Sequence, residues 1–333
     1  MPRITLFGNT GLVYFPKNLH IFLFFIWIFF RRPIKTTRPA WRQTANSSSW
    51  RPNCIKITPF PRCIQTSYPN MAQHPYRRLR PQRFELPEVG ISEEGNIRSL
   101  HLGSATIQSS MNLDHPADLV LSYSRAMMGW LLFAEQAPAH ITQIGLGGGS
   151  FARWIDAYLP DTRQTAIDIN PQVISVARSL FELPFEDAHF EIVEADGAEY
   201  IKTVRGGTDV ILVDGFDGEQ IIDALVGEAF FRDCRRALSP DGVFVTNWWS
   251  GDKRYGRFVE SLLDVFEGRV LELPAESHGN MAVFGFQSAP KEQHFDKLKK
   301  RADKLGSQYG LDFPRMLAAI KSHNQNNGKS LYL

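Results

Sequence analysis

Short apolar runs alternate with segments of helical periodicity from residue 117 onward. The runs predict buried strands, and the amphipathic segments between them predict helices. The expected strands are Ile141–Leu146, Arg163–Asp168, His189–Ala195, Asp209–Asp214 and Gly242–Trp248. The expected helices are Phe151–Tyr158, Pro171–Leu180, Ala198–Val204, Gln220–Ala237 and Tyr255–Phe266. This alternation predicts right-handed crossovers and a parallel sheet covered on both faces.

Two further apolar runs end this alternation. Val270–Pro274 and Met281–Gln287 are separated by only about six residues, too few for a helical crossover, so they predict an antiparallel hairpin at one edge of the sheet. The expected fold class is therefore α/β: a doubly wound, mostly parallel, seven-stranded sheet with a terminal antiparallel hairpin. That layout is typical of class I methyltransferase-like sheets, whereas the last strand of a dinucleotide-binding sheet is parallel.

The segments on either side of this sheet have their own patterns. Residues 88–111 alternate apolar and polar positions between glycines and predict two or three short antiparallel strands. Residues 117–134 have helical spacing, with Asp114 or Asp118 as the expected cap. Residues 291–325 should be helical, with a break near Gly310 and Pro314.

The expected domain organisation follows these changes of pattern. Residues 1–70 form a leader, and residues 71–116 form a basic tail and a small β-element. Residues 117–290 form the methyltransferase-like domain, and residues 291–333 form a helical extension.

Charge separates the leader from the rest of the chain. Residues 1–70 contain ten Lys or Arg and no acidic residue, whereas residues 71–333 contain 27 basic and 35 acidic residues, a net charge of −8. The overall charge of +2 therefore averages two unlike parts. Because the folded part is mildly acidic, we expect no nucleic-acid partner.

The leader carries a short apolar run, Leu19–Phe30. A helix that crosses a bilayer needs about 20 apolar residues, so no stable membrane span is expected. The residues after the run offer no signal-peptide cleavage site, although the lack of acidic residues permits a transit peptide. We favour an upstream extension or a misassigned start, with Met71 as the natural first residue.

The three cysteines are Cys54, Cys63 and Cys234, and they form no metal-binding or disulfide spacing. Cys234 should be buried in a helix. No metal site is expected, and a reducing, cytoplasmic compartment is the expected location.

The stretch ITQIGLGGGSFARWI, residues 141–155, is the centre of the predicted site. A buried strand leads into a turn containing Gly145, Gly147, Gly148 and Gly149, and a helix starts near Ser150. Glycines permit positive φ and close approach of a ligand to the backbone. The N–H groups that open the helix then face the ligand.

Acidic residues end the next three predicted strands, at the edge of the sheet where doubly wound folds bind ligands. Asp168 lies about 20 residues beyond the glycines, where a carboxylate can accept both ribose hydroxyls. Asp196, followed by Gly197, is placed to accept from an adenine amine, and Asp214 is followed by Asp217. Asp168 and Asp196 alternatively cap the helices that follow them. Together the spacings favour an adenosyl ligand.

At these residues the sequence resembles the spermidine synthase (polyamine aminopropyltransferase) family. The glycine turn, Asp168, Asp196 with Gly197, and the DGFD segment at 214–217 match its motifs over most of residues 88–290. The resemblance implies aminopropyl transfer from decarboxylated S-adenosylmethionine to a small diamine, with methylthioadenosine as the second product. It also places Gln108 near the donor and Tyr123 near the acceptor amine. Family members are commonly dimers or tetramers, which makes a homodimer one expected assembly.

Some family positions hold different residues here. Gly148 stands where the family has the aspartate that holds the donor's ammonium group, Ser124 and Arg125 replace a His/Gln-Glu pair, and Gly218 replaces a proline. Asp114, Asp118 or Glu219 are candidate replacement acids. An S-adenosylmethionine-dependent methyltransferase stays open as an alternative, because the methionyl carboxylate would attract Arg125, and so does a non-catalytic nucleoside-binding protein.

Aminopropyl transfer needs an amine lone pair aligned with the carbon beside the donor's sulfonium. A carboxylate next to the amine can orient it and accept its proton. By the resemblance and its strand-end position, Asp214 is the candidate base, and Asp217 and Tyr123 are expected to position the amine. The predicted donor-binding residues are Gln108, Gly145, Gly147, Gly149, Asp168, Asp196 and Gly197.

Overall fold

The computed structural model describes residues 86–216, 222–277 and 279–333. All of them belong to one of the chain's two compact units, Arg78–Leu333. The predictions made for the leader and the basic tail therefore lie outside the described residues. Within the described part, no helix has the length and apolar character needed to cross a membrane.

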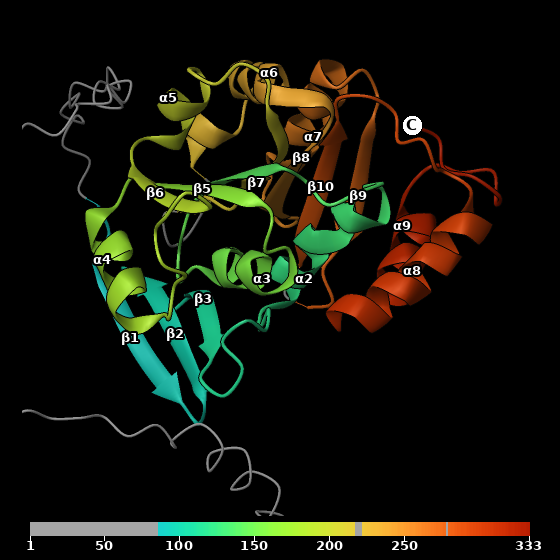
Figure 1. Cartoon of the computed structure of the whole chain (residues 1–333). Helices are drawn as coiled ribbons and strands as arrows, with labels where there is room; N and C mark the ends of the chain where they lie inside the picture. Colours follow the sequence, from blue (N-terminus) through green and yellow to red (C-terminus); the bar gives the residue numbers. More distant parts are fainter. Residues whose placement is uncertain (1–85, 217–221, 278) are drawn as a thin grey trace, which may run out of the picture. The chain divides into compact units, whose positions relative to one another are not determined.

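A seven-stranded sheet forms the centre of this unit (Figure 1). Its strand order is β6-β5-β4-β7-β8-β10-β9, and β4 to β8 run parallel. Strand β10 is antiparallel to both β8 and β9, which confirms the predicted fold class and terminal hairpin. The strands are β4 (His140–Ile144), β5 (Arg163–Asp168), β6 (Phe190–Glu194), β7 (Thr208–Val213), β8 (Leu238–Trp249), β9 (Val270–Pro274) and β10 (Asn280–Phe286).

Helices cover both faces of the sheet. On one face α5 (Gly197–Ile201), α6 (Glu228–Ala237) and α7 (Tyr255–Val265) pack into one apolar cluster, which includes Cys234 as predicted. On the other face lie α3 (Ser150–Tyr158) and α4 (Pro171–Leu180). Asn170 begins α4, because its side chain accepts from the N–H of Gln172 and Pro171 supplies a pre-set φ. The asparagine therefore takes the capping role considered for Asp168.

Two predicted helices are shorter than their apolar spacing indicated. In the 117–134 segment, α2 spans Ser122–Met127 and a 3-10 helix, η1, spans Met128–Leu132. The helix begins after Leu121 with no side-chain cap, so the prediction of capping by Asp114 or Asp118 was wrong. In the 220–237 segment, a 3-10 turn, η2 (Asp223–Leu225), precedes α6, and Gly227 separates them.

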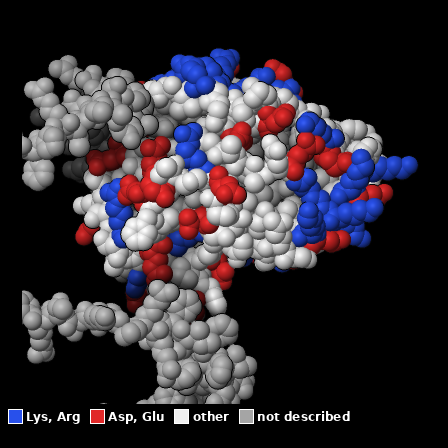
Figure 2. Space-filling model, in the orientation of Figure 1, with Lys and Arg blue, Asp and Glu red and all other residues white. Residues whose placement is uncertain are grey.

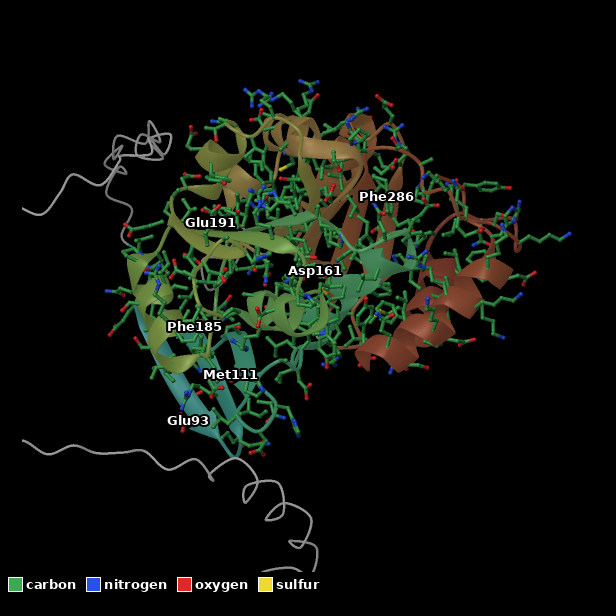
Figure 3. All side chains as sticks on the ribbon, viewed as in Figure 1. Glu93, Met111, Asp161, Phe185, Glu191 and Phe286 are labelled. Carbon is green, nitrogen blue, oxygen red and sulfur yellow. The ribbon has the colours of Figure 1, made fainter. Side chains whose placement is uncertain are left out.

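A small antiparallel sheet precedes the main sheet. It contains β1 (Val89–Glu94), β2 (Ile97–Leu102) and β3 (Ile107–Asn112). Leu100 and Met111 pack with Phe181, at the end of α4, in a separate apolar cluster. Figure 3 shows Met111 on this small sheet. Ser109 Oγ also lies 3.2 Å from Ser150 Oγ, so β3 lies against the glycine turn.

Two helices follow the hairpin. Helix α8 (Phe295–Tyr309) ends at Gly310, which has a φ of 69°. Asp312 then caps α9 (Phe313–His323), with Pro314 in its first turn. The break occurs where the glycine and the proline predicted it. Lys and Arg side chains gather over α8 with acidic side chains among them (Figure 2), as expected for a solvated face.

Candidate active site

A large cavity lies at the carboxyl ends of the parallel strands. Its volume is about 1680 Å³, and its wall includes residues from β3, α2, the glycine turn and the ends of β4, β5, β7 and β8. The predicted site residues on its wall are Gln108, Tyr123, Gly145, Gly147, Asp168, Asp196, Gly197 and Asp214. The fold therefore brings into one cavity residues that span more than 100 positions of the sequence.

The glycine turn brings the end of β4 close to the end of β7. Gly145 has a φ of 93°, and a Cβ there would lie 2.2 Å from the backbone oxygen of Asp214. Gly147 has a φ of 53° and also faces the cavity. Gly149, with a φ of 71°, starts α3 instead, and a Cβ there would meet Leu183. Unlike the other two, Gly149 is not on the described cavity wall.

Asp168 is held by the turn that it faces. Its Oδ2 accepts from the N–H of Leu146 over 2.9 Å, and its Oδ1 accepts from the N–H of Asn170 over 2.8 Å. Burial raises the pKa of this carboxyl group, and these backbone donors oppose that rise. Asp168 thus orders the glycine turn and also offers a carboxylate to the cavity.

Asp196 has the capping role that the sequence left open for it. Its Oδ1 accepts from the N–H groups of Ala198 and Glu199, at 2.8 and 3.2 Å, and so starts α5. The side chain also lies on the cavity wall. Gly197 is required beside it, because a Cβ there would come within 2.3 Å of Ile144.

Asp214 lies at the end of β7 between two polar side chains. Asn247 Nδ2 donates to its Oδ1 over 3.1 Å. The hydroxyl of Tyr123 donates to the backbone oxygen of Gln108 over 2.9 Å and lies close enough to the Asp214 carboxylate to stabilise its charge. Burial raises the pKa of Asp214 to about 6, and the Asn247 hydrogen bond and the nearby Tyr123 hydroxyl limit the rise. At neutral pH most of this carboxyl group is ionised and able to accept a proton.

Burial acts in the same direction on Tyr123. It raises the pKa of the hydroxyl well above its usual range, and the nearby Asp214 carboxylate raises it further. The tyrosine therefore remains a protonated hydrogen-bond donor at neutral pH.

Asn247 was missed by the sequence analysis. It lies two residues before the end of β8, and because Val213 pairs with Thr246 it is level with Asp214 on the neighbouring strand; it also lines the cavity. A polar residue in the otherwise apolar run VFVTNWW was the available signal. Asn280, the first residue of β10, donates to Asn247 Oδ1 over 3.1 Å.

The departures from the family motif have local explanations. A Cβ at Gly148 would lie 2.8 Å from the Phe181 ring and 2.9 Å from Ser109 Oγ, so this position has no room for a carboxylate. Arg125 lies on the cavity wall, but its Nη1 donates to the carbonyls of Leu119 and Val120. Its Nη2 lies 3.3 Å from Glu276, so the charge is already compensated within the protein.

Several predicted contributors are not brought into this cavity or are not described. Asp217, Gly218 and Glu219 lie outside the described residues. Asp114 and Asp118 are not on the described cavity wall. Trp249, the last residue of β8, lines the cavity and is 53% exposed. The described residues contain no group of three or more His, Cys, Asp or Glu arranged to hold a metal ion.

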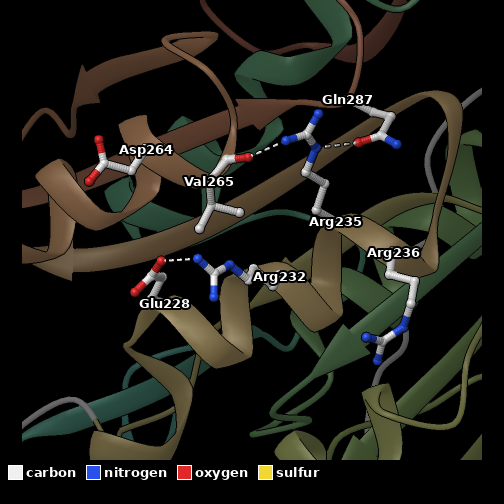
Figure 4. Close-up of a pocket in the computed structure, with 7 residues that line it drawn as sticks. All are labelled: Glu228, Arg232, Arg235, Arg236, Asp264, Val265 and Gln287. Atoms are coloured by element: carbon white, nitrogen blue, oxygen red, sulfur yellow. Dashed lines mark hydrogen bonds and ion pairs between the residues drawn. The ribbon is translucent and has the colours of Figure 1, made fainter.

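A second, smaller hollow lies on the outer side of α6 and α7 (Figure 4). It is lined by Glu228, Arg232, Arg235, Arg236, Asp264, Val265 and Gln287. Each of its arginines is already in an ion pair: Arg232 with Glu228, Arg235 with Glu267, and Arg236 with Asp233. The residues at the strand ends, Asp168, Asp196 and Asp214, line the larger cavity instead.

Comparison with known proteins agrees with this geometry. Residues 120–250 match the spermine/spermidine synthase domain family. A polyamine aminopropyltransferase of Neisseria meningitidis serogroup A is 79% identical over 263 residues, which are 79% of this chain and all of that protein. Its counterpart in Chromobacterium violaceum is 64% identical over 261 residues, 78% of this chain and all of that protein.

The solved structures support the fold. Spermidine synthase from Thermotoga maritima superposes with a TM-score of 0.53 at 19% sequence identity, covering 74% of this chain and 84% of that one. The extent and level of identity to full-length relatives, together with the strand-end cavity, show that this chain belongs to the polyamine aminopropyltransferase family.

Proposed function

We propose that this chain transfers the aminopropyl group of decarboxylated S-adenosylmethionine to a small diamine and releases methylthioadenosine. One observation carries the proposal: the Asp214 carboxylate opens into the same cavity as the glycine turn, Asp168 and Asp196. A nucleoside donor and an amine acceptor can therefore meet beside a single buried carboxylate.

The donor half of the cavity fits an adenosyl group by the chemistry of its wall. Asp168 offers a carboxylate for ribose hydroxyls, and Asp196 offers one for an exocyclic amine, while Gly145 and Gly147 present backbone without side chains. Gln108 approaches from β3. When bound there, the donor supplies an electrophilic methylene carbon next to a sulfonium.

The acceptor half is centred on Asp214. The attacking nitrogen uses its lone pair to form the new C–N bond as the C–S bond breaks, and the sulfur keeps the electrons of that bond as a neutral thioether. The nitrogen then carries a surplus proton, which passes to the Asp214 carboxylate. With its pKa raised to about 6, this carboxyl group is a stronger base than an exposed aspartate. Asn247 donates to this carboxylate and fixes the direction in which it faces, and the protonated Tyr123 hydroxyl nearby helps to stabilise its charge.

The alternative function, methyl transfer, depended on Arg125 being free to attract the methionyl carboxylate of intact S-adenosylmethionine. The hydrogen bonds of Arg125 to two carbonyls and to Glu276 remove that argument. We also propose that the acceptor is a small-molecule amine, that no metal takes part, that the chain forms a homodimer, and that it acts in the cytoplasm. Asp217, which lies outside the described residues, remains a proposed positioning residue for the amine.

The test compares the full chain with Asp214→Asn. Each is incubated with a diamine and either decarboxylated or intact S-adenosylmethionine, and the nucleoside products are identified by mass spectrometry. We expect methylthioadenosine and a triamine from the decarboxylated donor alone, and a loss of turnover of about 100-fold or more in the variant with methylthioadenosine binding retained. Adenosylhomocysteine as the product would overturn aminopropyl transfer, and unchanged turnover in the variant would remove Asp214 as the base.

A further inference from the structure

Arg125 joins two parts of the chain that meet at Asp214. Helix α2 carries both Arg125 and Tyr123, and the Tyr123 hydroxyl, which donates to the backbone oxygen of Gln108, lines the cavity together with Asp214. Glu276, the ion-pair partner of Arg125, lies between β9 and β10. Asn280 at the start of β10 reaches Asp214 through Asn247.

The start of α2 depends on such tertiary contacts, because its N-cap residue, Leu121, makes no side-chain capping bond. Arg125 Nη1 donates to the carbonyls of Leu119 and Val120, at 2.8 and 2.7 Å, and so folds the preceding segment against the helix. Its Nη2 reaches Glu276 Oε2 over 3.3 Å.

A second contact lies beside the ion pair. Ser122 Oγ is 2.8 Å from Ser277 Oγ, and both serines line the cavity. The two contacts use consecutive residues on the hairpin side, Glu276 and Ser277. On α2 they use residues nearly one helical turn apart, Ser122 and Arg125. They therefore restrain both the position and the rotation of the helix. We name these four residues the α2 clasp.

We propose that Arg125 is a positioning residue for the reaction: through the α2 clasp it holds Tyr123 against Asp214. The role rests on the proposed aminopropyl transfer, since Asp214 is the base of that reaction. Arg125 acts through Tyr123 and compensates its own charge on Glu276 and two carbonyls. An arginine can therefore lie on the wall of an amine-binding cavity, because its charge is compensated within the protein.

The α2 clasp should also affect the pKa of Asp214, which a contact that only stabilises the fold would leave unchanged. The Asn247 hydrogen bond and the nearby Tyr123 hydroxyl lower the pKa of Asp214 against the effect of burial. Releasing α2 removes the Tyr123 contribution, so the pKa of Asp214 should rise. The acidic limb of the kcat/KM profile should then move to higher pH.

Arg315 offers a matched control on the same carboxylate. Its Nη1 lies 3.3 Å from Glu276 Oε1, the same distance as on the Arg125 side, but Arg315 belongs to α9 and is 62% exposed. Arg315→Gln therefore removes an ion pair from Glu276 without touching α2.

The experiment compares Arg125→Gln, Arg125→Lys, Glu276→Gln and Arg315→Gln in the full chain, with kcat, KM and the pH profile measured for each. For Arg125→Gln and Glu276→Gln we expect kcat to fall about tenfold or more, little change in the donor KM, and an acidic limb displaced to higher pH. Arg125→Lys should recover part of kcat, because an ammonium keeps the charge but not the planar geometry. Arg315→Gln should match the wild type. An unmoved acidic limb in both Arg125→Gln and Glu276→Gln would overturn the proposal.

Amide hydrogen exchange over residues 119–127 gives a readout that needs no substrate. Exchange should be faster in Arg125→Gln and Glu276→Gln than in Arg315→Gln. Equal protection in all variants would refute the clasp whatever the activity shows. Conversely, absence of aminopropyl transfer by the wild type, together with faster exchange in these variants, would refute the proposed function and leave the contact intact. Should Arg125→Gln fail to fold, Glu276→Gln carries both measurements.

Discussion

Asn247 donates through Nδ2 to Oδ1 of Asp214 over 3.1 Å, and its own Oδ1 accepts from Asn280 Nδ2 over 3.1 Å. The Asn280 bond determines which end of the Asn247 amide faces Asp214, because an amide presents donors on one side and an acceptor on the other. The ionised form of Asp214 therefore meets a donor. The pKa of the proposed base is thus lowered by Asn247 on the neighbouring strand, and the amide of Asn247 is in turn oriented by Asn280 on the next strand.

Replacing Asn247 by alanine should move the pH dependence of the reaction. The variant loses a hydrogen bond that stabilises the charged carboxylate, so the pKa of Asp214 should rise above about 6. The acidic limb of kcat/KM should shift by about one pH unit to higher pH. Thr246→Val is the control, because Thr246 is the preceding residue of β8, points to the opposite face, and has a buried hydroxyl without a partner in the described structure. An identical profile for Asn247→Ala would contradict the tuning role.

Asp214→Asn should be more stable than the wild type at neutral pH although it is inactive. Burial raises the pKa of Asp214 from 3.8 to about 6, so between these pH values the folded state binds more protons than the unfolded state. The Asp214 contribution to the free energy of unfolding therefore falls as pH rises through this window, by about 1 to 3 kcal/mol in total. The asparagine variant has no charge to bury and escapes this loss. Denaturant unfolding at pH 8 and pH 4 measures the difference, which should be present at pH 8 and small at pH 4; equal stability at both would contradict it.

Two substitutions at Asp196 should separate helix capping from ligand binding. Asp196→Ala removes the acceptor for the N–H groups of Ala198 and Glu199 and should cost about 1 kcal/mol of stability. Asp196→Ser keeps a capping oxygen and should retain nearly all of it. If the carboxylate recognises adenine, both variants should bind methylthioadenosine at least about fivefold more weakly in titration calorimetry. Wild-type affinity in Asp196→Ser would restrict Asp196 to its capping role.

Restoring the family aspartate at Gly148 should damage the protein. The new Cβ would lie 2.8 Å from the ring of Phe181, which is fully buried and cannot move aside. We expect a loss of about 1 to 3 kcal/mol in the free energy of unfolding and no tighter donor binding. Gly256→Asp is the matched control, since a Cβ at Gly256 meets nothing within 4 Å and an acid in the first turn of α7 is favourable. A stable Gly148→Asp variant with tighter donor binding would show that the site accommodates the missing acid.

The sequence by itself determined the sheet and much of the candidate cavity wall. Strand β5 and helix α4 have the predicted limits, because a short, continuously buried strand and a Pro-led helix are encoded locally. Since parallel strands end at one edge, Asp168, Asp196 and Asp214 were expected to converge, and they do line one cavity. Asn247 also follows an apolar strand segment and lines this cavity, but only acidic residues were considered as candidates at the strand ends.

Tertiary structure decided what local pattern leaves open. The apolar spacing of residues 117–134 reflects burial against the sheet and α8, and it continues past the point where α2 becomes a 3-10 helix. The partner of Arg125 is Glu276, 151 residues away, and no periodicity links the two. The space around Gly148 is filled by Phe181, from the far end of the next helix. These features depend on which segments meet in three dimensions, and that is determined by packing of the whole unit rather than by the residues on either side.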